Sequence, residues 1–157
     1  YITASYDLNT DQQPFVRFAP IFLSKLSEYP DLYGNVRHGI FELPDRVEIA
    51  KSDSVDMVLT FRNVHNWMAR GQAENAMRVF YDVLKPGGIF GVVEHRGNPL
   101  VPQDPKSKSG YVNEAFMIQL AESAGFVLEA SSDGFHFCFY PLLDLDDFPS
   151  CRPFYHA

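Results

Sequence analysis

Two short segments carry most of the side chains that could perform chemistry. FRNVHNW occupies residues 61–67, and EHR occupies residues 94–96. Each follows an apolar run typical of a buried strand, so each is expected where a strand ends. In an open α/β sheet the carboxyl ends of the strands form the ligand-binding edge. The position of both segments at strand ends therefore predicts that their side chains line opposite sides of one pocket.

These residue types indicate proton transfer and the recognition of a polar molecule. A histidine changes charge near neutral pH, so His65 is a candidate general base, and Asn63 and His95 are further candidates for catalysis. Arg96 could hold a carboxylate or phosphate through two parallel hydrogen bonds. The candidates for substrate contact are Asn66, Trp67, Glu94, Arg96 and Tyr111.

Structural alternatives remain open for both segments. Trp67 and His65 could be packing groups at the start of a helix. Glu94 and Arg96 could form a structural ion pair instead of contacting a ligand.

Hydrophobic periodicity indicates that strands and helices alternate around these segments. The expected strands are residues 1–7, 36–43, 55–61, 89–93, 127–130 and 135–140, and the expected helices are 11–28, 70–84 and 111–124. Such alternation predicts an α/β protein with a mostly parallel sheet and flanking helices.

Local patterns add detail to this sheet. The nearly continuous apolar run 55–61 predicts a strand buried on both faces. Lys85–Gly88 is expected to form a turn that ends the preceding helix, because proline cannot continue a helix. Residues 29–35 are expected to form a loop, and 97–109 a longer loop that could act as a lid. The alternating run 135–140 predicts a strand that is antiparallel or at an edge.

Composition limits the classes of partner. The chain has 157 residues, enough for one domain with a core, and 46% of them are apolar. A net charge of -7 argues against nucleic acid or an anionic membrane as the main partner. Two cysteines, Cys138 and Cys151, are too few for a disulfide framework, so they are either unpaired or joined in a single bridge. No Cys/His spacing matches a zinc site.

Several stretches together resemble a known family. They are ITASYDLN, GIFELP, SVDMVLTFRNVHNW, VLKPGGIFGVVEHRG and SGYVNEAFMIQLAESAGFVLEASSD. In this combination the chain resembles the C-terminal two-thirds of class I S-adenosylmethionine-dependent methyltransferases, and among them a group of bacterial predicted methyltransferases. LKPGG is common to many methyltransferases, whereas the combination of FRNVHNW, EHRG and the helix from GYV to AGF is more specific.

The resemblance implies a Rossmann-like α/β fold, S-adenosylmethionine as the cofactor and a small molecule as the substrate. Asp7 is placed to accept hydrogen bonds from the ribose hydroxyls, although aspartate is also common in loops and helix caps. By resemblance Phe41 and Glu42 lie near the adenine, with a plain core position as the alternative for Phe41. The residues implied to line the cofactor after the next strand are Thr60, Arg62 and Asn63.

The sequence departs from the family in two places. No GxGxG-like segment occurs in the chain, although such enzymes have a glycine-rich loop after their first strand. By resemblance the chain starts at the second strand of the fold, and the absent first strand would lie between the second and fourth strands. Residues 134–157 also diverge, so we expect a partial methyltransferase-like domain at 1–133 followed by a divergent strand and tail.

The sequence therefore predicts a methyltransferase of unknown small-molecule substrate, in which catalysis is mainly placement of the nucleophile and the methyl group. The alternative is a non-catalytic remnant that acts as a binding or oligomerising module, with a homo-oligomer covering exposed strand edges. No metal is expected. The sequence leaves the compartment open between cytoplasm and periplasm, because the natural N-terminus is not visible in it.

Overall fold

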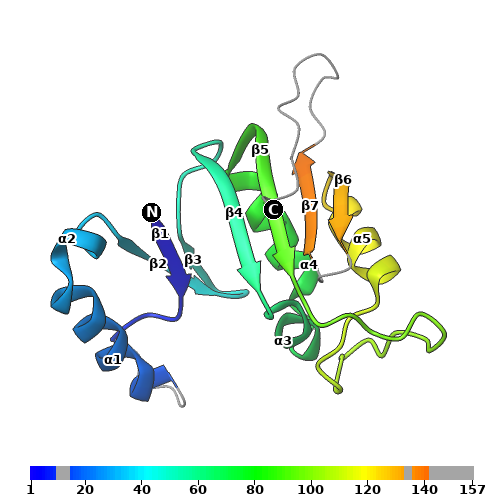
Figure 1. The fold of residues 1–157 in the computed structure, drawn as a ribbon, viewed down its shortest axis with the longest axis horizontal. Coiled ribbons are helices and arrows are strands. Elements are labelled where there is room, and N and C mark those ends of the chain that lie inside the picture. The colour runs from blue at the N-terminus through cyan, green and yellow to red at the C-terminus, as the bar shows by residue number, and fades with distance from the viewer. Residues whose placement is uncertain (10–14, 133–135, 142–157) are drawn as a thin grey trace, which may run out of the picture. The chain divides into compact units, whose positions relative to one another are not determined.

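The computed structural model describes residues 1–9, 15–132 and 136–141, in two compact units. The first unit is Tyr1–Ala50 and the second is Lys51–Ala157. The described strands form two sheets, one in each unit, and Figure 1 shows helices beside both of them. The chain is thus an α/β protein, as its sequence predicts. No described helix is long and apolar enough to cross a membrane.

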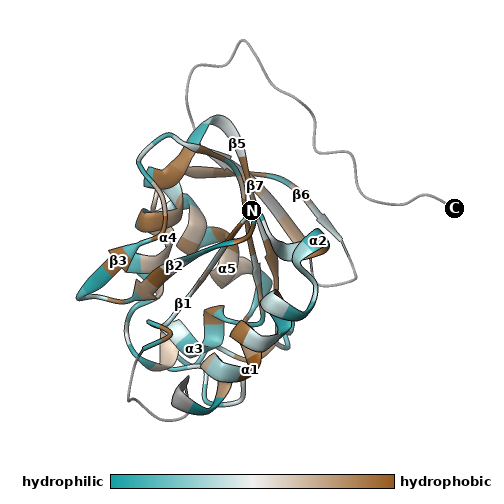
Figure 2. Ribbon diagram, turned by 90° about the vertical axis from the view of Figure 1, so that its left-hand side faces the viewer, coloured by the Kyte–Doolittle hydropathy of each residue, from teal (hydrophilic) through white to brown (hydrophobic). Residues whose placement is uncertain are grey.

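The first unit contains a three-stranded sheet and two helices. In chain order its elements are β1 (Ile2–Ser5), α1 (Phe15–Glu28), α2 (Pro30–Tyr33), β2 (Arg37–Glu42) and β3 (Arg46–Glu48). β1 pairs with β2 in parallel, and β3 pairs with β2 in antiparallel register. The sequence predicts neither α2, which lies in the expected loop 29–35, nor β3. The short β3 is mainly hydrophilic, as its colour in Figure 2 shows, so it lacks the apolar pattern that identifies a strand.

The second unit contains a four-stranded sheet. Its elements are β4 (Val55–Phe61), α3 (Val64–Ala69), α4 (Ala73–Val83), β5 (Leu84–Val93), α5 (Glu114–Glu122), β6 (Phe126–Ser132) and β7 (His136–Pro141). The strand order is β4-β5-β7-β6, with β4 and β5 parallel and β7 antiparallel to both of its neighbours. The prediction of a strand at 135–140 that is antiparallel or at an edge is confirmed in its first form, since β7 is antiparallel and lies between β5 and β6; residue 135 is outside the described residues.

An aromatic cluster forms the core of the second unit. Phe90 in β5 is fully buried, and its ring centroid lies 5.3 Å from Phe80 and 5.0 Å from Phe126. Phe139 stacks on it from β7, with the centroids 5.9 Å apart. Because these rings come from α4, β5, β6 and β7, their contacts hold the sheet and its helix together.

The prediction that Lys85–Gly88 forms a turn between the helix and the next strand is wrong. β5 begins at Leu84, directly after α4, and the Lys-Pro-Gly-Gly segment lies inside the strand. Val55 pairs with Leu84 but Met57 pairs with Ile89, so the extra residues form an irregularity in the ladder. Gly87 has φ +72° there, a conformation that glycine adopts without steric cost.

The expectation that β4 is buried on both faces is also wrong. Met57, Leu59 and Phe61 point to one face of the sheet, and their exposed fractions are 44%, 55% and 59%. Their register partners on β5 are Ile89, Gly91 and Val93, all half-buried. The helices of the second unit therefore leave this apolar face of the sheet uncovered.

Candidate functional site

A side-chain contact joins His65 to Glu94, two of the predicted site residues of the second unit. The ring Nδ1 of His65 lies 3.0 Å from Oε1 of Glu94. The side chain of Glu94 is only 2% exposed, whereas that of His65 is 21% exposed. A buried carboxylate therefore holds a histidine ring that still reaches the surface.

The pair forms because two parallel strands end side by side. Phe61, the last residue of β4, is in register with Val93, the last residue of β5. Glu94 directly follows β5, and His65 is the second residue of α3, which follows β4 after a short bend. The backbone N–H of Arg62, at φ +56°, donates to the carbonyl of Val93 at 2.7 Å and fixes that bend.

Glu94 also satisfies backbone donors. Its Oε2 accepts a hydrogen bond from the backbone N–H of His65 at 3.3 Å, and its Oε1 accepts one from the backbone N–H of His95 at 2.9 Å. The N–H of His65 belongs to the opening turn of α3, so it has no acceptor within the helix. The structure thus places Glu94 against protein donors, although the sequence assigned it to substrate contact.

The other residues of the 60–67 segment mainly bind one another. The side-chain amide of Asn63 donates to Oγ1 of the buried Thr60 at 3.4 Å, and that of Asn66 donates to the carbonyl of Arg62 at 3.4 Å. The ring of Trp67 packs against Phe80 at 5.4 Å, as the packing alternative anticipated. No sequence pattern distinguishes these contacts from contacts with a ligand.

The residues of the EHR segment, 94–96, lie in different environments. The ring of His95 lies over Tyr111, with centroids 5.6 Å apart, and both residues are exposed. Arg96 binds Glu114 at 3.3 Å and donates to the carbonyl of Ser132 at 2.8 Å. The structural ion pair of Arg96 is therefore made with Glu114 and not with Glu94.

A hollow of about 850 Å³ lies beside the loop 97–109. Two predicted substrate residues, Arg96 and Tyr111, line it together. Its further lining residues include Gln103, Asp104, Lys108 and Asn113. The volume is within the range of small-molecule sites, and the surface of the hollow is mostly apolar with a few polar side chains, as is typical of such sites.

The loop 97–109 is braced by its own side chains. Asp104 accepts hydrogen bonds from the backbone N–H groups of Lys106 and Lys108, at 3.0 and 3.1 Å. These two N–H groups lower the pKa of Asp104 below its usual value. The side-chain carbonyl of Gln103 accepts from the backbone N–H of Asn113 at 2.6 Å. The expected lid is thus an internally hydrogen-bonded loop.

Replacing Asp104 with alanine is expected to loosen this loop. The variant removes the acceptor for two backbone N–H groups, so their amide hydrogens should exchange faster by about tenfold or more. Hydrogen exchange of Lys106 and Lys108 measures the effect, and Asp56→Ala at an exposed position of β4 is the control. Equal exchange in wild type and variant would contradict the bracing role.

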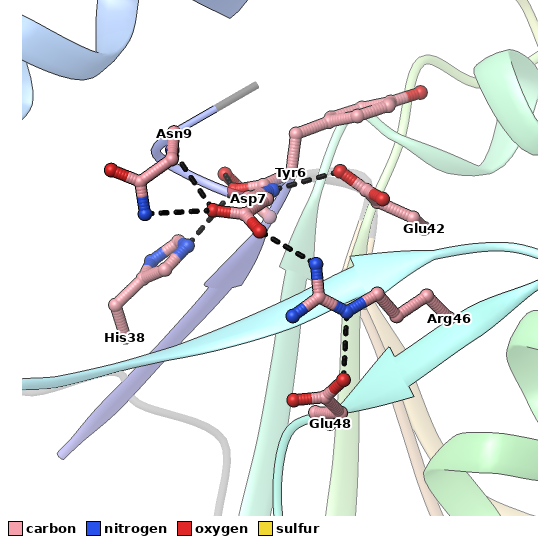
Figure 3. Close-up of polar contacts among 8 residues, drawn as sticks. Tyr6, Asp7, Asn9, His38, Glu42, Arg46 and Glu48 are labelled. Atoms are coloured by element: carbon pink, nitrogen blue, oxygen red, sulfur yellow. Dashed lines mark hydrogen bonds and ion pairs between the residues drawn. The ribbon is translucent and has the colours of Figure 1, made fainter.

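The predicted ribose acid, Asp7, lies in the first unit within a polar network (Figure 3). Its Oδ1 accepts from the backbone N–H of Asn9 at 2.9 Å, and its Oδ2 accepts from Arg46 at 2.6 Å. Arg46 also binds Glu48 at 2.7 Å. Glu42 joins the network because its Oε1 accepts from the backbone N–H of Asp7 at 2.8 Å. Sequence reasoning missed Arg46, since only the pairing of β3 with β2 brings it near Asp7.

Asp7 and Glu42 stand at the carboxyl ends of two neighbouring parallel strands. Ser5 in β1 pairs with Ile40 in β2, and each acid follows or ends its strand. A cavity of about 260 Å³ adjoins Asp7, lined by Thr3, Ser5, Tyr6, Asp7, Leu8, Phe18, Ala19, Phe22 and His38. Phe41, the predicted adenine neighbour, is buried in β2 as its core alternative anticipated.

The Asp7 network predicts a pH dependence of stability. The backbone N–H of Asn9, and then Arg46, lower the pKa of Asp7 below its usual 3.8. A depressed pKa stabilises the fold above about pH 4, and this contribution is lost as the pH falls through the folded value. Urea unfolding of wild type and Asp7→Asn should differ at pH 6, and the difference should shrink as the pH falls below 4. An unchanged difference would contradict the assignment.

The fold resembles solved structures, although no model of a known protein family and no curated protein matches the chain. A SAM-dependent methyltransferase from Methanosarcina mazei matches with a TM-score of 0.60 and 15% identity, covering 92% of this chain and 84% of that one. An O-methyltransferase family protein from Burkholderia thailandensis matches with a TM-score of 0.58 and 17% identity, covering 88% and 42%. The [4+2]-cyclase SpnF matches with a TM-score of 0.54 and 19% identity, covering 81% and 42%.

These likenesses establish the class of fold. The chain has the Rossmann-like α/β fold of class I methyltransferases, as its sequence predicts. The chain spans less than half of the Burkholderia protein and of SpnF. Because SpnF is a cyclase by name, the fold alone does not determine the reaction, and function must be argued from the site.

Proposed function

We propose that this chain is an S-adenosylmethionine-dependent methyltransferase that acts on a small polar molecule. The observation that carries the proposal is the pair of carboxylates, Asp7 and Glu42, at the carboxyl ends of parallel strands in a fold shared with such enzymes. Ligands of open α/β sheets bind at this edge.

The carboxylates suit the ribose of the cofactor. A carboxylate can accept about four hydrogen bonds. Asp7 accepts from Asn9 and Arg46, which leaves capacity for a hydroxyl donor, and Glu42 accepts one bond from Asp7. The adjoining cavity of about 260 Å³ is near the lower limit of small-molecule pockets, so it suits a part of the cofactor rather than all of it.

The substrate side is proposed to lie in the second unit. S-adenosylmethionine, when bound, supplies a methyl group on a positively charged sulfur. The residues of this chain would bind the acceptor molecule, orient it and exclude water. Arg96 and Tyr111 line the larger hollow, and Asn63, Asn66 and His95 are further proposed contacts.

Methyl transfer tests the proposal directly. Cofactor with a labelled methyl group should transfer the label to members of a panel of small polar acceptors. Asp7→Asn should weaken cofactor binding by about 10-fold to 100-fold, because a hydrogen bond to a charged group contributes about 1.5–3 kcal/mol. Asp45→Asn, in the exposed loop before β3, is the matched control. Binding of equal strength in both variants would contradict the assignment of Asp7.

A second candidate is a methyltransferase-like module that associates with a second copy of itself. It is favoured by β4, which ends its sheet and presents the exposed side chains of Met57, Leu59 and Phe61. A two-fold axis can pair such an edge strand with its own copy in antiparallel register. Light scattering, which measures the mass of the particle in solution, distinguishes the two candidates. A wild-type dimer that becomes a monomer in Phe61→Glu would support the module. A wild-type monomer at all concentrations would oppose it.

A further inference from the structure

We propose that His38 and Glu42 are positioning residues that hold the backbone just before Asp7 and thereby fix its carboxylate. The inference rests on the proposed function, in which this carboxylate binds the ribose of the cofactor. It adds two side chains that orient the carboxylate before the cofactor arrives. All the groups concerned belong to the first unit, and Figure 3 shows them together.

One peptide group, which joins Tyr6 to Asp7, is bound at both of its polar atoms. Its carbonyl oxygen belongs to Tyr6 and accepts a hydrogen bond from Nε2 of His38 at 2.9 Å. Its N–H belongs to Asp7 and donates to Oε1 of Glu42 at 2.8 Å. The two side chains are four residues apart on β2, so they project from the same face of the strand. The two bonds form a clamp on this planar group, which cannot rotate without breaking one of them.

The clamp begins where the regular pairing of β1 with β2 ends. The last pair of the ladder is Ser5 with Ile40, and the chain bends at Tyr6. A bent chain cannot continue the backbone ladder, so its next carbonyl and N–H groups need other partners. The two side chains from β2 supply these partners. The chain therefore leaves the sheet in a defined direction at Asp7.

The surroundings of His38 fix its ring for this role. A carbonyl oxygen only accepts hydrogen bonds, so Nε2 carries the hydrogen, and Nδ1 of the neutral ring is then an acceptor. The hydroxyl of Thr3, the register partner of His38, lies 3.3 Å from Nδ1 and can donate to it. The ring also packs against Phe22 of α1, with the centroids 5.9 Å apart. These contacts hold the ring with its donor directed at Tyr6.

The clamp complements the bonds that the carboxylate of Asp7 makes itself. Its Oδ1 accepts from the backbone N–H of Asn9 at 2.9 Å, and its Oδ2 accepts from Arg46 at 2.6 Å. The clamp fixes the backbone from which this side chain starts, and the two bonds fix its end. A carboxylate that is already oriented loses less freedom when a ribose hydroxyl donates to it, so the cofactor should bind more tightly.

Amide hydrogen exchange of Asp7 tests the clamp without any ligand. His38→Phe keeps an aromatic ring against Phe22 but removes the donor to Tyr6. The N–H of Asp7 should then exchange about threefold to tenfold faster. His38→Gln has a side-chain amide donor and should recover most of the wild-type protection. Tyr33→Phe, which removes the hydroxyl of an aromatic residue on α2, is the matched control and should change nothing. Equal exchange in wild type and His38→Phe would overturn the inference.

Glu42 is tested by a second pair of variants. Glu42→Leu removes the acceptor of the Asp7 N–H, whereas Glu42→Gln keeps a carbonyl oxygen that can accept the same bond. The readout is the exchange of the Asn9 N–H, which donates to the carboxylate of Asp7. It should be about threefold to tenfold faster in Glu42→Leu and close to wild type in Glu42→Gln. Unchanged exchange in Glu42→Leu would overturn the role of Glu42.

Two further measurements test what the clamp does for the carboxylate. The bonds from Asn9 and Arg46 hold the pKa of Asp7 below its usual 3.8, so in His38→Phe a displaced carboxylate should titrate at a higher pH. The same variant should bind S-adenosylhomocysteine about threefold to tenfold more weakly, and His38→Gln should recover most of this loss. A role of His38 in stability alone would leave both measurements unchanged in the folded variant.

The outcomes separate the inference from the proposed function. If His38→Phe binds S-adenosylhomocysteine as tightly as the wild type, the positioning role is overturned and the proposed function stands. If the wild type does not bind S-adenosylhomocysteine, the proposed function and the ribose role of Asp7 are overturned. In that case faster exchange of Asp7 in His38→Phe still supports the clamp, and equal exchange overturns the clamp as well.

Discussion

Phe90→Ala is expected to lower the free energy of unfolding of the second unit by about 3–5 kcal/mol. The ring is fully buried and lies within 6 Å of three other aromatic rings, so its loss leaves a cavity between α4 and the sheet. Urea unfolding followed by the fluorescence of Trp67 measures the effect. This residue is the single tryptophan of the chain and packs on Phe80 at 5.4 Å.

Leu59→Ala is the matched control for that substitution. Leu59 lies on the neighbouring strand β4 but is 55% exposed, so its truncation should change the free energy of unfolding by less than about 1 kcal/mol. If the two variants lost the same stability, the aromatic cluster could not be the core of the second unit.

Glu94→Leu is expected to lower the free energy of unfolding by about 2–3 kcal/mol. The apolar side chain would leave two backbone N–H groups and the ring of His65 without their acceptor, and a buried unsatisfied donor costs about 1–3 kcal/mol. Glu94→Gln keeps one carbonyl oxygen as an acceptor, so its cost should be smaller. The same urea titration measures both variants.

Glu74→Leu makes the same change at an exposed position. Comparing its free energy of unfolding with that of Glu94→Leu separates the effect of burial from the effect of losing a charge. Glu74 is an exposed glutamate on α4 that pairs with Arg78 across one helical turn at 3.7 Å. Such surface pairs contribute little, so this control should stay within about 0.5 kcal/mol of the wild type. A Glu94→Leu variant as stable as this control would mean that Glu94 does not anchor the site.

Local patterns predicted the elements with strong apolar periodicity and failed where distant pairing decides the structure. The bounds of β4 agree with the expected 55–61, and α4 and α5 lie within their expected helices. The irregularity at Lys85–Gly88 depends on how β5 pairs with β4. The interior position of β7 depends likewise on pairing with β5 and β6, which no local pattern encodes.

The candidate site likewise combines residues that the sequence indicates with contacts that depend on strand pairing. His65 could be proposed as a base from its type and its place after a strand. Its contact with Glu94 could not be predicted, because it follows from the register that aligns Phe61 with Val93. The bond from Arg46 to Asp7 depends in the same way on the pairing of β3 with β2. Residue type thus indicates chemistry, whereas strand register decides which groups meet.

Calorimetric titration with S-adenosylhomocysteine, the demethylated product of the cofactor, measures whether this chain binds the methyl-donor cofactor. The product lacks the reactive methyl group, so the measurement needs no knowledge of the substrate. A single site with a dissociation constant in the micromolar range, weakened in Asp7→Asn but not in Asp45→Asn, is the expected result. Absence of binding at millimolar ligand, with a folded chain, would contradict the proposed function.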